Sequence, residues 1–415
     1  MLIQFNFKNF KCFKNETTLD MTATSITEHP YNLMECANGE KYIKTAAIYG
    51  ANASGKSSVI QAYSFMRDWV VNSFKQASEK ENIPFKRFAF DNKSKDELAE
   101  FEVFFRNNKN EFQYGFSLDN KKIHEEWLYI KNAKNKFIPL FERNGSDIEC
   151  NSKMLKGADN FTTMVKEKTL FLSIISNANV PYAKNVFEWF AVNLVIDYGS
   201  VVFEDAITKF IHLTPDINDI DFQQRLTTFL NAIDINIEGI IIEKNKTNDD
   251  DINYKIYTKH LIEGGNDYYK LPLSEESSGT QKMFSLFYFL QSALKYRLTL
   301  FIDELDSKLH PLLLRYILTM FHDENINKKG AQLIYTTHDN YTLTRDIFRR
   351  DQIWFVEKDN NAVSNLYSLV EYKSDEDKKI RKDASYNKDY LLGKYGAVPI
   401  LRGYDMWRTE DAEAK

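Results

Sequence analysis

The sequence predicts an α/β fold built around a mixed, mostly parallel β-sheet. The last third of the chain alternates apolar runs with helical patterns, which is typical of a parallel sheet covered by helices. A strand-like run, a glycine-containing loop and a helical pattern follow one another over residues 46–70. Residues 101–130 form short alternating runs separated by Asn, Asp and Lys turns, which indicates antiparallel strands. We therefore expect a mixed sheet core with an antiparallel β-subdomain and a helical insertion.

Composition narrows the class of protein. The 415 residues are enough for two or three lobes, and the 31 Phe and 23 Tyr argue against a disordered chain. The formal net charge of −5 excludes nucleic-acid binding by bulk charge, although a local basic surface stays open. The three cysteines are scattered without metal-ligand spacing, and an odd number in a long chain fits a reducing cytoplasm. No apolar run reaches membrane-spanning length, so we expect no membrane association.

The N-terminal part carries a phosphate-binding loop. Residues 50–57 match G-x-x-x-x-G-K-[ST] without a mismatch, between a buried strand at 46–49 and a helix that starts at Lys56. The loop N–H groups and the helix N-terminus bind phosphate oxygens. We expect Lys56 to reach the β- and γ-phosphates and Ser57 to ligate Mg²⁺. The nucleotide-contacting residues predicted here are Gly50, Asn52, Ser54, Gly55, Lys56, Ser57 and Ser58. A chance match in a Gly/Ser turn is the alternative, which the flanking strand and helix disfavour.

The middle of the chain changes from β-like to helical patterns. Predicted strands are at 101–105, 112–116 and 127–130, with hairpin loops at 107–110 and 119–122. Predicted helices are at 161–176, 183–197, 203–212 and 221–232, followed by strands at 237–242 and 254–257. No sustained heptads occur here, so we do not expect a long coiled-coil arm.

A second apolar run, 298–302, ends in Asp303 and Glu304. This layout, known as Walker B, predicts that Asp303 holds Mg²⁺ directly or through water. Glu304 is then the general base that orients and activates the attacking water. A strand ending in an ordinary acidic turn is the alternative, but the P-loop upstream favours the functional interpretation. The long separation of Lys56 from Asp303 implies a sizeable module between two halves of one sheet.

Two further segments contain candidate residues of the nucleotide site. The run 334–337 leads to His338, which would lie just past a strand end, where it can meet the γ-phosphate. We expect hydrolysis to depend on Lys56, Glu304 and His338. The Ser- and Gly-containing segment 274–282 precedes a helix expected from about Gln281 to Tyr296. It is either an anion site or a plain helix cap, and the segment taken alone favours the cap.

The order of these segments resembles that of ABC-type ATPase heads. More specifically, the chain resembles the SMC-like, AAA-type ATPases of the RloA type, with OLD-family ATPases as more distant relatives. The matching segments are 9–13, 50–57, 277–281, 303–306, 309–311, 337–338 and 390–399. The resemblance implies an ABC/SMC-like P-loop ATPase head in three parts. Residues 1–120 would form the half with the P-loop, 121–270 an insertion, and 271–415 the half with the signature, Walker B and switch segments and the C-terminal tail.

The resemblance also implies roles for single residues. Ser278 and Gly279 would be signature residues that reach the γ-phosphate bound by a second copy, and His338 would be the switch histidine. Lys11 stands where relatives often carry an arginine near the nucleotide. Gln113 is a candidate for the Q-loop glutamine, although an ordinary strand residue is the simpler interpretation.

The implied cofactors are ATP and Mg²⁺, and the implied reaction converts ATP and water to ADP and phosphate. The implied assembly is a homodimer or higher homo-oligomer joined through ATP. RloA-type ATPases belong to prokaryotic defence loci, so the resemblance implies a sensor or regulator of a separately encoded effector such as a nuclease, without nuclease activity of its own. The alternative is a RecF-like DNA-repair or DNA-clamp ATPase with DNA as its partner. A transporter subunit is disfavoured by the long span between P-loop and signature, and a non-hydrolysing scaffold by Glu304 and His338.

Overall fold

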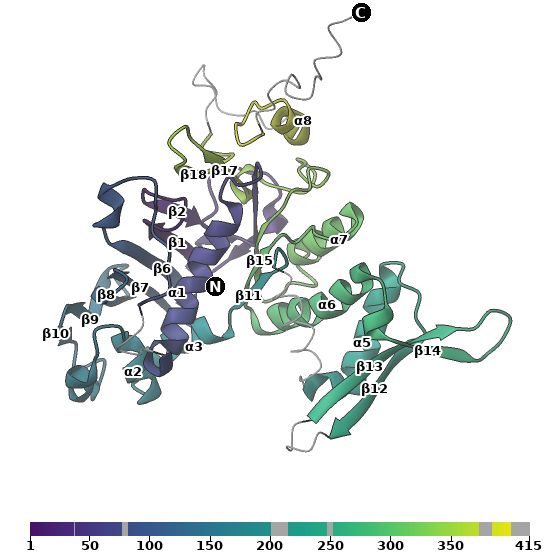
Figure 1. Cartoon of the computed structure of the whole chain (residues 1–415), viewed down its shortest axis with the longest axis horizontal. Helices are drawn as coiled ribbons and strands as arrows, with labels where there is room; N and C mark the ends of the chain where they lie inside the picture. The colour runs from purple at the N-terminus through teal and green to yellow at the C-terminus, as the bar shows by residue number, and fades with distance from the viewer. Residues whose placement is uncertain (37, 77–81, 201–214, 247–251, 373–383, 400–415) are drawn as a thin grey trace, which may run out of the picture.

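The computed structural model describes residues 1–36, 38–76, 82–200, 215–246, 252–372 and 384–399. Two sheets pack on opposite sides of helix α1 (Lys56–Gln76), and a smaller third sheet lies beyond them (Figure 1). Apolar side chains along α1 are buried, among them Val59, Ile60, Tyr63, Met66, Trp69 and Val70. Tyr63 stacks on Phe301 of the neighbouring sheet, with ring centroids 3.8 Å apart. The helix that follows the P-loop therefore joins the two large sheets.

The sheet that carries the predicted site has six strands in the order β11-β15-β16-β5-β17-β18. The strands are β5 (Thr45–Gly50), β11 (Leu194–Asp197), β15 (Thr299–Asp303), β16 (Gln332–Thr336), β17 (Ile353–Lys358) and β18 (Ser364–Ser368). All neighbours pair in parallel except β18, which is antiparallel to β17. Every residue of β5, β15 and β16 is buried, as expected for a parallel sheet covered on both faces. The predicted mostly parallel sheet is confirmed.

The second sheet is antiparallel and has seven strands in the order β10-β9-β8-β7-β6-β1-β2. Its strands are β1 (Leu2–Lys8), β2 (Thr17–Asp20), β6 (Ala99–Asn107), β7 (Asn110–Leu118), β8 (Ile123–Lys131), β9 (Phe137–Asn144) and β10 (Asp147–Cys150). The predicted strands and both hairpin loops occur here. The domain boundary expected at residue 120 falls between β7 and β8. Residues 121–150 extend this sheet, because β8 pairs with β7 along its whole length.

A buried glutamine ties the two large sheets together. Gln332, the first residue of β16, accepts the N–H of Leu2 at 2.7 Å and donates to the carbonyl of Leu2 at 2.9 Å. The remaining short elements are β3 (Leu33–Glu35), β4 (Lys41–Ile43), η1 (Pro30–Asn32), η2 (Lys93–Lys95), η4 (Pro215–Asn218), η5 (Leu273–Glu275) and η6 (Arg350–Gln352).

The helices after α1 depart from the prediction in three places. They are α2 (Phe171–Asn177), α3 (Ala183–Val192), α5 (Ile220–Ala232), α6 (Ser278–Tyr296), α7 (Pro311–His322) and α8 (Tyr386–Leu391). The helix expected over 161–176 is a 3-10 segment, η3 (Ala158–Met164), followed by the shorter α2. The helix expected over 183–197 stops at Val192, because its last residues pair with β15 as strand β11. Helix α6 starts before Gln281, because the Ser277 hydroxyl caps it by accepting the N–H of Thr280. The helix expected over 221–232 is confirmed as α5, whereas 203–212 lies outside the described residues.

The third sheet consists of β12 (Gly239–Lys246), β13 (Ile252–Leu261) and β14 (Tyr268–Pro272). Its inner face packs on α5, which packs on α6, in a core separate from that of the antiparallel sheet. In Figure 1 it extends from the molecule at the end opposite β8–β10. Among the helices in the described ranges, none is both long and apolar enough to cross a membrane.

Candidate nucleotide-binding site

The parallel sheet brings the predicted motifs to one edge. The carboxyl ends of parallel strands are the usual position of ligand sites in α/β folds. Strand β16 lies between β15 and β5, so a single strand separates Asp303 from Gly50. Burial lowers the pKa of the Lys56 ammonium, and the carboxylates of Asp303 and Glu304 act in the opposite direction. Segments that are far apart in the sequence therefore share one electrostatic environment.

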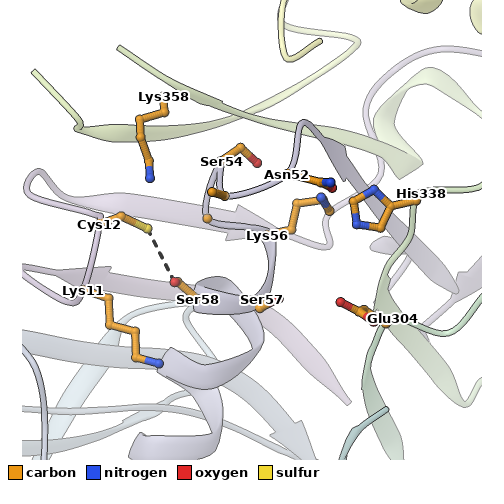
Figure 2. A pocket seen from close by; sticks show the side chains of 12 residues that line it. Lys11, Cys12, Asn52, Ser54, Lys56, Ser57, Ser58, Glu304, His338 and Lys358 are labelled. Carbon is orange, nitrogen blue, oxygen red and sulfur yellow. Dashed lines mark hydrogen bonds between the residues drawn. The ribbon is translucent and has the colours of Figure 1, made fainter. Parts of the chain in front are cut away.

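A cavity of about 780 Å³ lies at this edge, a size typical of small-molecule sites. Its lining residues are Lys11, Cys12, Asn52, Ala53, Ser54, Gly55, Lys56, Ser57, Ser58, Glu304, His338 and Lys358 (Figure 2). Most of the predicted site residues are among them. The predicted residues that do not line the cavity are Gly50, Asp303, Ser278 and Gly279.

The P-loop conformation suits an anion. The Lys56 ammonium donates to the carbonyls of Gly50 at 2.9 Å and Ala51 at 3.1 Å. Gly55 has φ +115°, and a Cβ at this position would lie 2.6 Å from the Cys12 sulfur. The buried Ser54 hydroxyl has no hydrogen-bond partner among the residues that the structure describes. A phosphate group would satisfy this hydroxyl and give the ammonium an anionic partner, so the loop fits a nucleoside triphosphate.

The carboxyl end of β15, with Asp303 and the following Glu304, is hydrogen-bonded to a hydroxyl of the neighbouring strand. Asp303 is buried, and Thr336 of β16 donates its hydroxyl to the Asp303 carboxylate. The same hydroxyl accepts the N–H of Glu304 at 2.8 Å. Glu304 itself has φ +51°, a left-handed conformation that is strained for a residue other than glycine and is typical of functional sites. Ser57 and Asp303 supply hard oxygen ligands of the kind that hold Mg²⁺ beside nucleotide phosphates.

A buried lysine links the loop behind Glu304 to helix α6. Lys282 donates to the carbonyls of Glu304 at 3.3 Å, Leu305 at 2.8 Å and Ser307 at 2.6 Å. Its ammonium also lies 3.9 Å from the centre of the Tyr198 ring. Because Lys282 is one turn from the start of α6, the position of that helix determines where the loop lies.

The signature candidates lie at the start of α6, outside the cavity. Ser277 is the N-cap residue, as the cap interpretation predicted, and Ser278 is exposed at the first helical position. A Cβ on Gly279 would lie 3.3 Å from the Lys308 carbonyl, so this glycine packs against the loop that follows Glu304. Ser278 is therefore exposed to other molecules, and neither Ser278 nor Gly279 lines the cavity of its own chain.

His338 and Lys11 enter the cavity from two other segments. His338 follows β16, and its backbone N–H donates to the Asp306 carboxylate at 3.1 Å. Its ring lies near Lys56 and Asn52 (Figure 2). Lys11 donates to Gln61 of α1, and burial followed by the nearby Lys86 lowers the pKa of the Lys11 ammonium.

The Q-loop candidate was wrong. Gln113 lies on β7 and donates to Glu102 at 2.7 Å in the antiparallel sheet, away from the cavity lining. The simpler interpretation of an ordinary strand residue is the correct one.

Three residues at this edge were missed by sequence reasoning. Asp197 ends β11 in register with Asp303, and burial together with the Asp303 charge raises the pKa of the Asp197 carboxyl. Its signal was an apolar run ending in a carboxylate, which the helical interpretation of 183–197 obscured. Lys358 at the end of β17 and Cys12 line the cavity, and the Cys12 sulfur lies 3.4 Å from the Ser58 hydroxyl. Lys358 belongs to no recognisable motif, whereas Cys12 lies in the matching segment 9–13, whose pattern gives this position no role in the site.

Comparison with known families agrees with this geometry. The family described as "AAA domain, putative AbiEii toxin, Type IV TA system" matches residues 46–344, from the strand before the P-loop to beyond His338. The chain belongs to this family. The matched region contains the P-loop, Asp303, Glu304 and His338, together with three neighbouring strands of the parallel sheet, β5, β15 and β16. No curated protein matches the chain.

Several solved structures are similar to the chain at low identity and with TM-scores below 0.5. The SMC head bound to the C-terminal winged-helix domain of ScpA is 15% identical, with a TM-score of 0.44, and the match covers 88% of this chain and 97% of that one. The SMC head domain from Thermotoga maritima is 15% identical, with a TM-score of 0.42 and coverage of 88% and 98%. The recombination mediator RecF with ATPrS is 13% identical, with a TM-score of 0.37 and coverage of 88% and 98%.

We expect Gly55→Ala in this AAA-family chain to weaken binding of a fluorescent ATP analogue by at least about tenfold. The new Cβ would meet the Cys12 sulfur and, at 2.9 Å, the Ser364 hydroxyl, which forces the P-loop to move. Equilibrium titration followed by fluorescence measures the effect.

Gly145→Ala is the matched control, because Gly145 also has positive φ but has nothing within 4 Å of the added Cβ. Equal losses of binding in the two variants would show that general destabilisation of the fold, rather than displacement of the P-loop, is responsible.

Proposed function

We propose that the protein binds and hydrolyses ATP as a dimer switch. ATP is held between the cavity of one copy and Ser278 and Gly279 of another. This proposal rests on one observation, that the predicted site residues fall into two separate groups. The P-loop, Glu304 and His338 share one cavity, whereas the signature residues lie outside it on the exposed start of α6.

In this proposal each residue has a simple electrostatic or proton-transfer role. Lys56 and the loop N–H groups compensate phosphate charge, and Lys11 adds a second ammonium. Ser57 and Asp303 hold Mg²⁺, which supplies further charge neutralisation when it is bound. Glu304 accepts a proton from the attacking water, and His338 lies toward the γ-phosphate.

Contact between the copies is coupled to hydrolysis through Lys282. A γ-phosphate bound by the partner copy fixes the start of α6 at Ser278. Lys282, one turn further along, then holds the backbone of the Glu304 loop through its three carbonyl contacts. Hydrolysis removes the γ-phosphate and releases the partner, which gives the two states of a switch.

We expect Glu304→Gln to retain ATP binding, to lower the hydrolysis rate by about a hundredfold or more, and to accumulate an ATP-bound dimer. The amide keeps the shape of the side chain but cannot accept the proton from water. Phosphate release and sedimentation velocity measure the two effects. Glu324→Gln, at an exposed position, is the control. Hydrolysis by Glu304→Gln at the parental rate would disprove the assignment of the base.

We expect a mixture of Lys56→Ala and Ser278→Arg subunits to recover hydrolysis that neither variant has alone. In a mixed dimer one shared site carries both changes, and the other carries an intact P-loop and an intact signature. Mixing the inactive preparations and measuring phosphate release tests this directly. If Ser278→Arg alone hydrolyses ATP at the parental rate, the signature role is wrong. If the mixture stays inactive, the two copies do not share their sites.

We also propose a cytoplasmic role in which this switch controls a separately encoded effector such as a nuclease in an anti-phage defence locus. The family description refers to a type IV toxin–antitoxin system, which is a two-component arrangement. The resemblance to RloA-type ATPases supports the same division between an ATPase and an effector. A RecF-like DNA clamp is the competing function, and its nucleotide site would look the same.

We expect the intact locus to reduce phage plating, and Lys56→Ala in the ATPase to abolish that protection. Deletion of the adjacent gene alone should have the same effect, because the ATPase acts through it. Efficiency of plating measures all three strains. Protection that survives deletion of the neighbouring genes would contradict the effector model, and increased sensitivity to DNA damage after loss of the ATPase would favour the DNA-clamp function.

A further inference from the structure

The outer face of the β12–β13–β14 sheet has a distinctive composition. Side chains alternate between the two faces of a strand, and Tyr254, Ile256 and Thr258 of β13 point into the core. The intervening residues, together with their cross-strand partners, lie on the opposite face, which no described element covers. We call this surface the tyrosine–lysine face; it consists of Lys255, Tyr257, Lys259 and Leu261 of β13, Tyr268 and Lys270 of β14, and Ile241 and Glu243 of β12.

Strand register places rings and ammonium groups alternately on this face. Leu261 pairs with Tyr268, and Lys259 pairs with Lys270. The Lys259 ammonium lies 4.5 Å from the centre of the Tyr268 ring, and the Lys270 ammonium lies 5.8 Å from that of Tyr257. Each positive charge is therefore next to an aromatic surface.

The charge of the face is opposite to that of the whole chain. It carries three lysines, and Glu243 on β12 lies opposite Lys255 and 3.0 Å from Lys270. The chain as a whole has a formal net charge of −5. A basic area on an acidic protein attracts a polyanion, whereas its acidic remainder repels one.

Large apolar groups are exposed where the β13–β14 hairpin turns. Leu261 is 59% exposed and Tyr268 47%, and the adjacent Ile262 and Tyr269 are 47% and 59% exposed. Exposed apolar groups gathered at one place mark an interaction site. Aromatic rings beside lysines are the chemistry with which sheet surfaces bind single-stranded nucleic acid, because bases stack on the rings and phosphates meet the cations.

We propose that the tyrosine–lysine face binds single-stranded nucleic acid. Bases stack on Tyr257 and Tyr268, and the phosphates are contacted by Lys255, Lys259 and Lys270. A duplex is bound less well, because its bases are stacked on one another and their faces are not available. This binding uses no residue of the nucleotide cavity, since the face belongs to a different sheet.

The test is fluorescence anisotropy with labelled oligothymidylate and oligouridylate of about 20 nucleotides, which exceeds the length of strand such surfaces hold. A duplex of the same length is compared, between about 50 and 200 mM salt. Both single strands are expected to bind more tightly than the duplex. Tyr268→Ala is expected to weaken binding roughly tenfold. Lys259→Gln is expected to reduce the slope of log affinity against log salt by about 0.7.

Two further variants separate binding from folding. Tyr257→Leu keeps an apolar side chain on the sheet and removes only the aromatic surface, so it should also weaken binding. Lys328→Gln combined with Lys329→Gln changes two exposed lysines between α7 and β16, and it should bind like the parent. ATP hydrolysis is measured on every preparation, so that failure of this proposal is distinguished from failure of the proposed ATPase.

The proposal is wrong if single strands bind no better than duplex, or if Tyr268→Ala and Tyr257→Leu bind like the parent. It is also wrong if the Lys328 and Lys329 changes, rather than those on the face, reduce binding. If the parent binds no strand but self-associates in sedimentation velocity, and Tyr268→Ala abolishes that association, the face belongs to a second copy of the chain.

Discussion

The parallel pairing of β15, β16 and β5 is the constraint on which the nucleotide site depends. These three strands are buried throughout, so their register is determined by core packing and backbone hydrogen bonds together. Their carboxyl ends then lie at one edge with the P-loop, the Walker B carboxylates and His338. This register also places Thr336 beside the two carboxylates. Its hydroxyl donates to the Asp303 carboxylate and accepts the backbone N–H of Glu304.

Lysines act in two different ways around this edge. Lys56, Lys11 and Lys358 line the cavity, where their positive charge suits an anion. Burial lowers the pKa of the first two, so an anionic ligand would relieve an existing electrostatic cost. Lys282 instead uses its ammonium on three backbone carbonyls, and it acts on the site by holding the loop behind Glu304.

Helix α6 lies between the parallel sheet and helix α5, with contacts to β15 on one side and to α5 on the other. Its start carries the exposed Ser278, its second turn carries Lys282, and it packs against α5, which in turn contacts β12 of the third sheet. A chain of contacts therefore runs from the third sheet through α5 and α6 to Lys282 and the Glu304 loop. This arrangement gives the accessory sheet a physical route to the nucleotide site without a shared cavity.

The sequence by itself determined the P-loop, the two Walker B carboxylates, the strand that precedes His338 and the mostly parallel character of the sheet. These features are local, because each depends on neighbouring residues whose spacing the backbone fixes. Only the tertiary structure decided that 194–197 is a strand. Three apolar residues followed by Asp197 fit either a helical or a strand period, and pairing with β15 selects the strand. The same reason explains why Asp197, Lys358 and Cys12 were missed. Each is a single side chain that reaches the site only through the fold. The alternation of tyrosines and lysines on the third sheet likewise appears only when strand register places separate segments side by side.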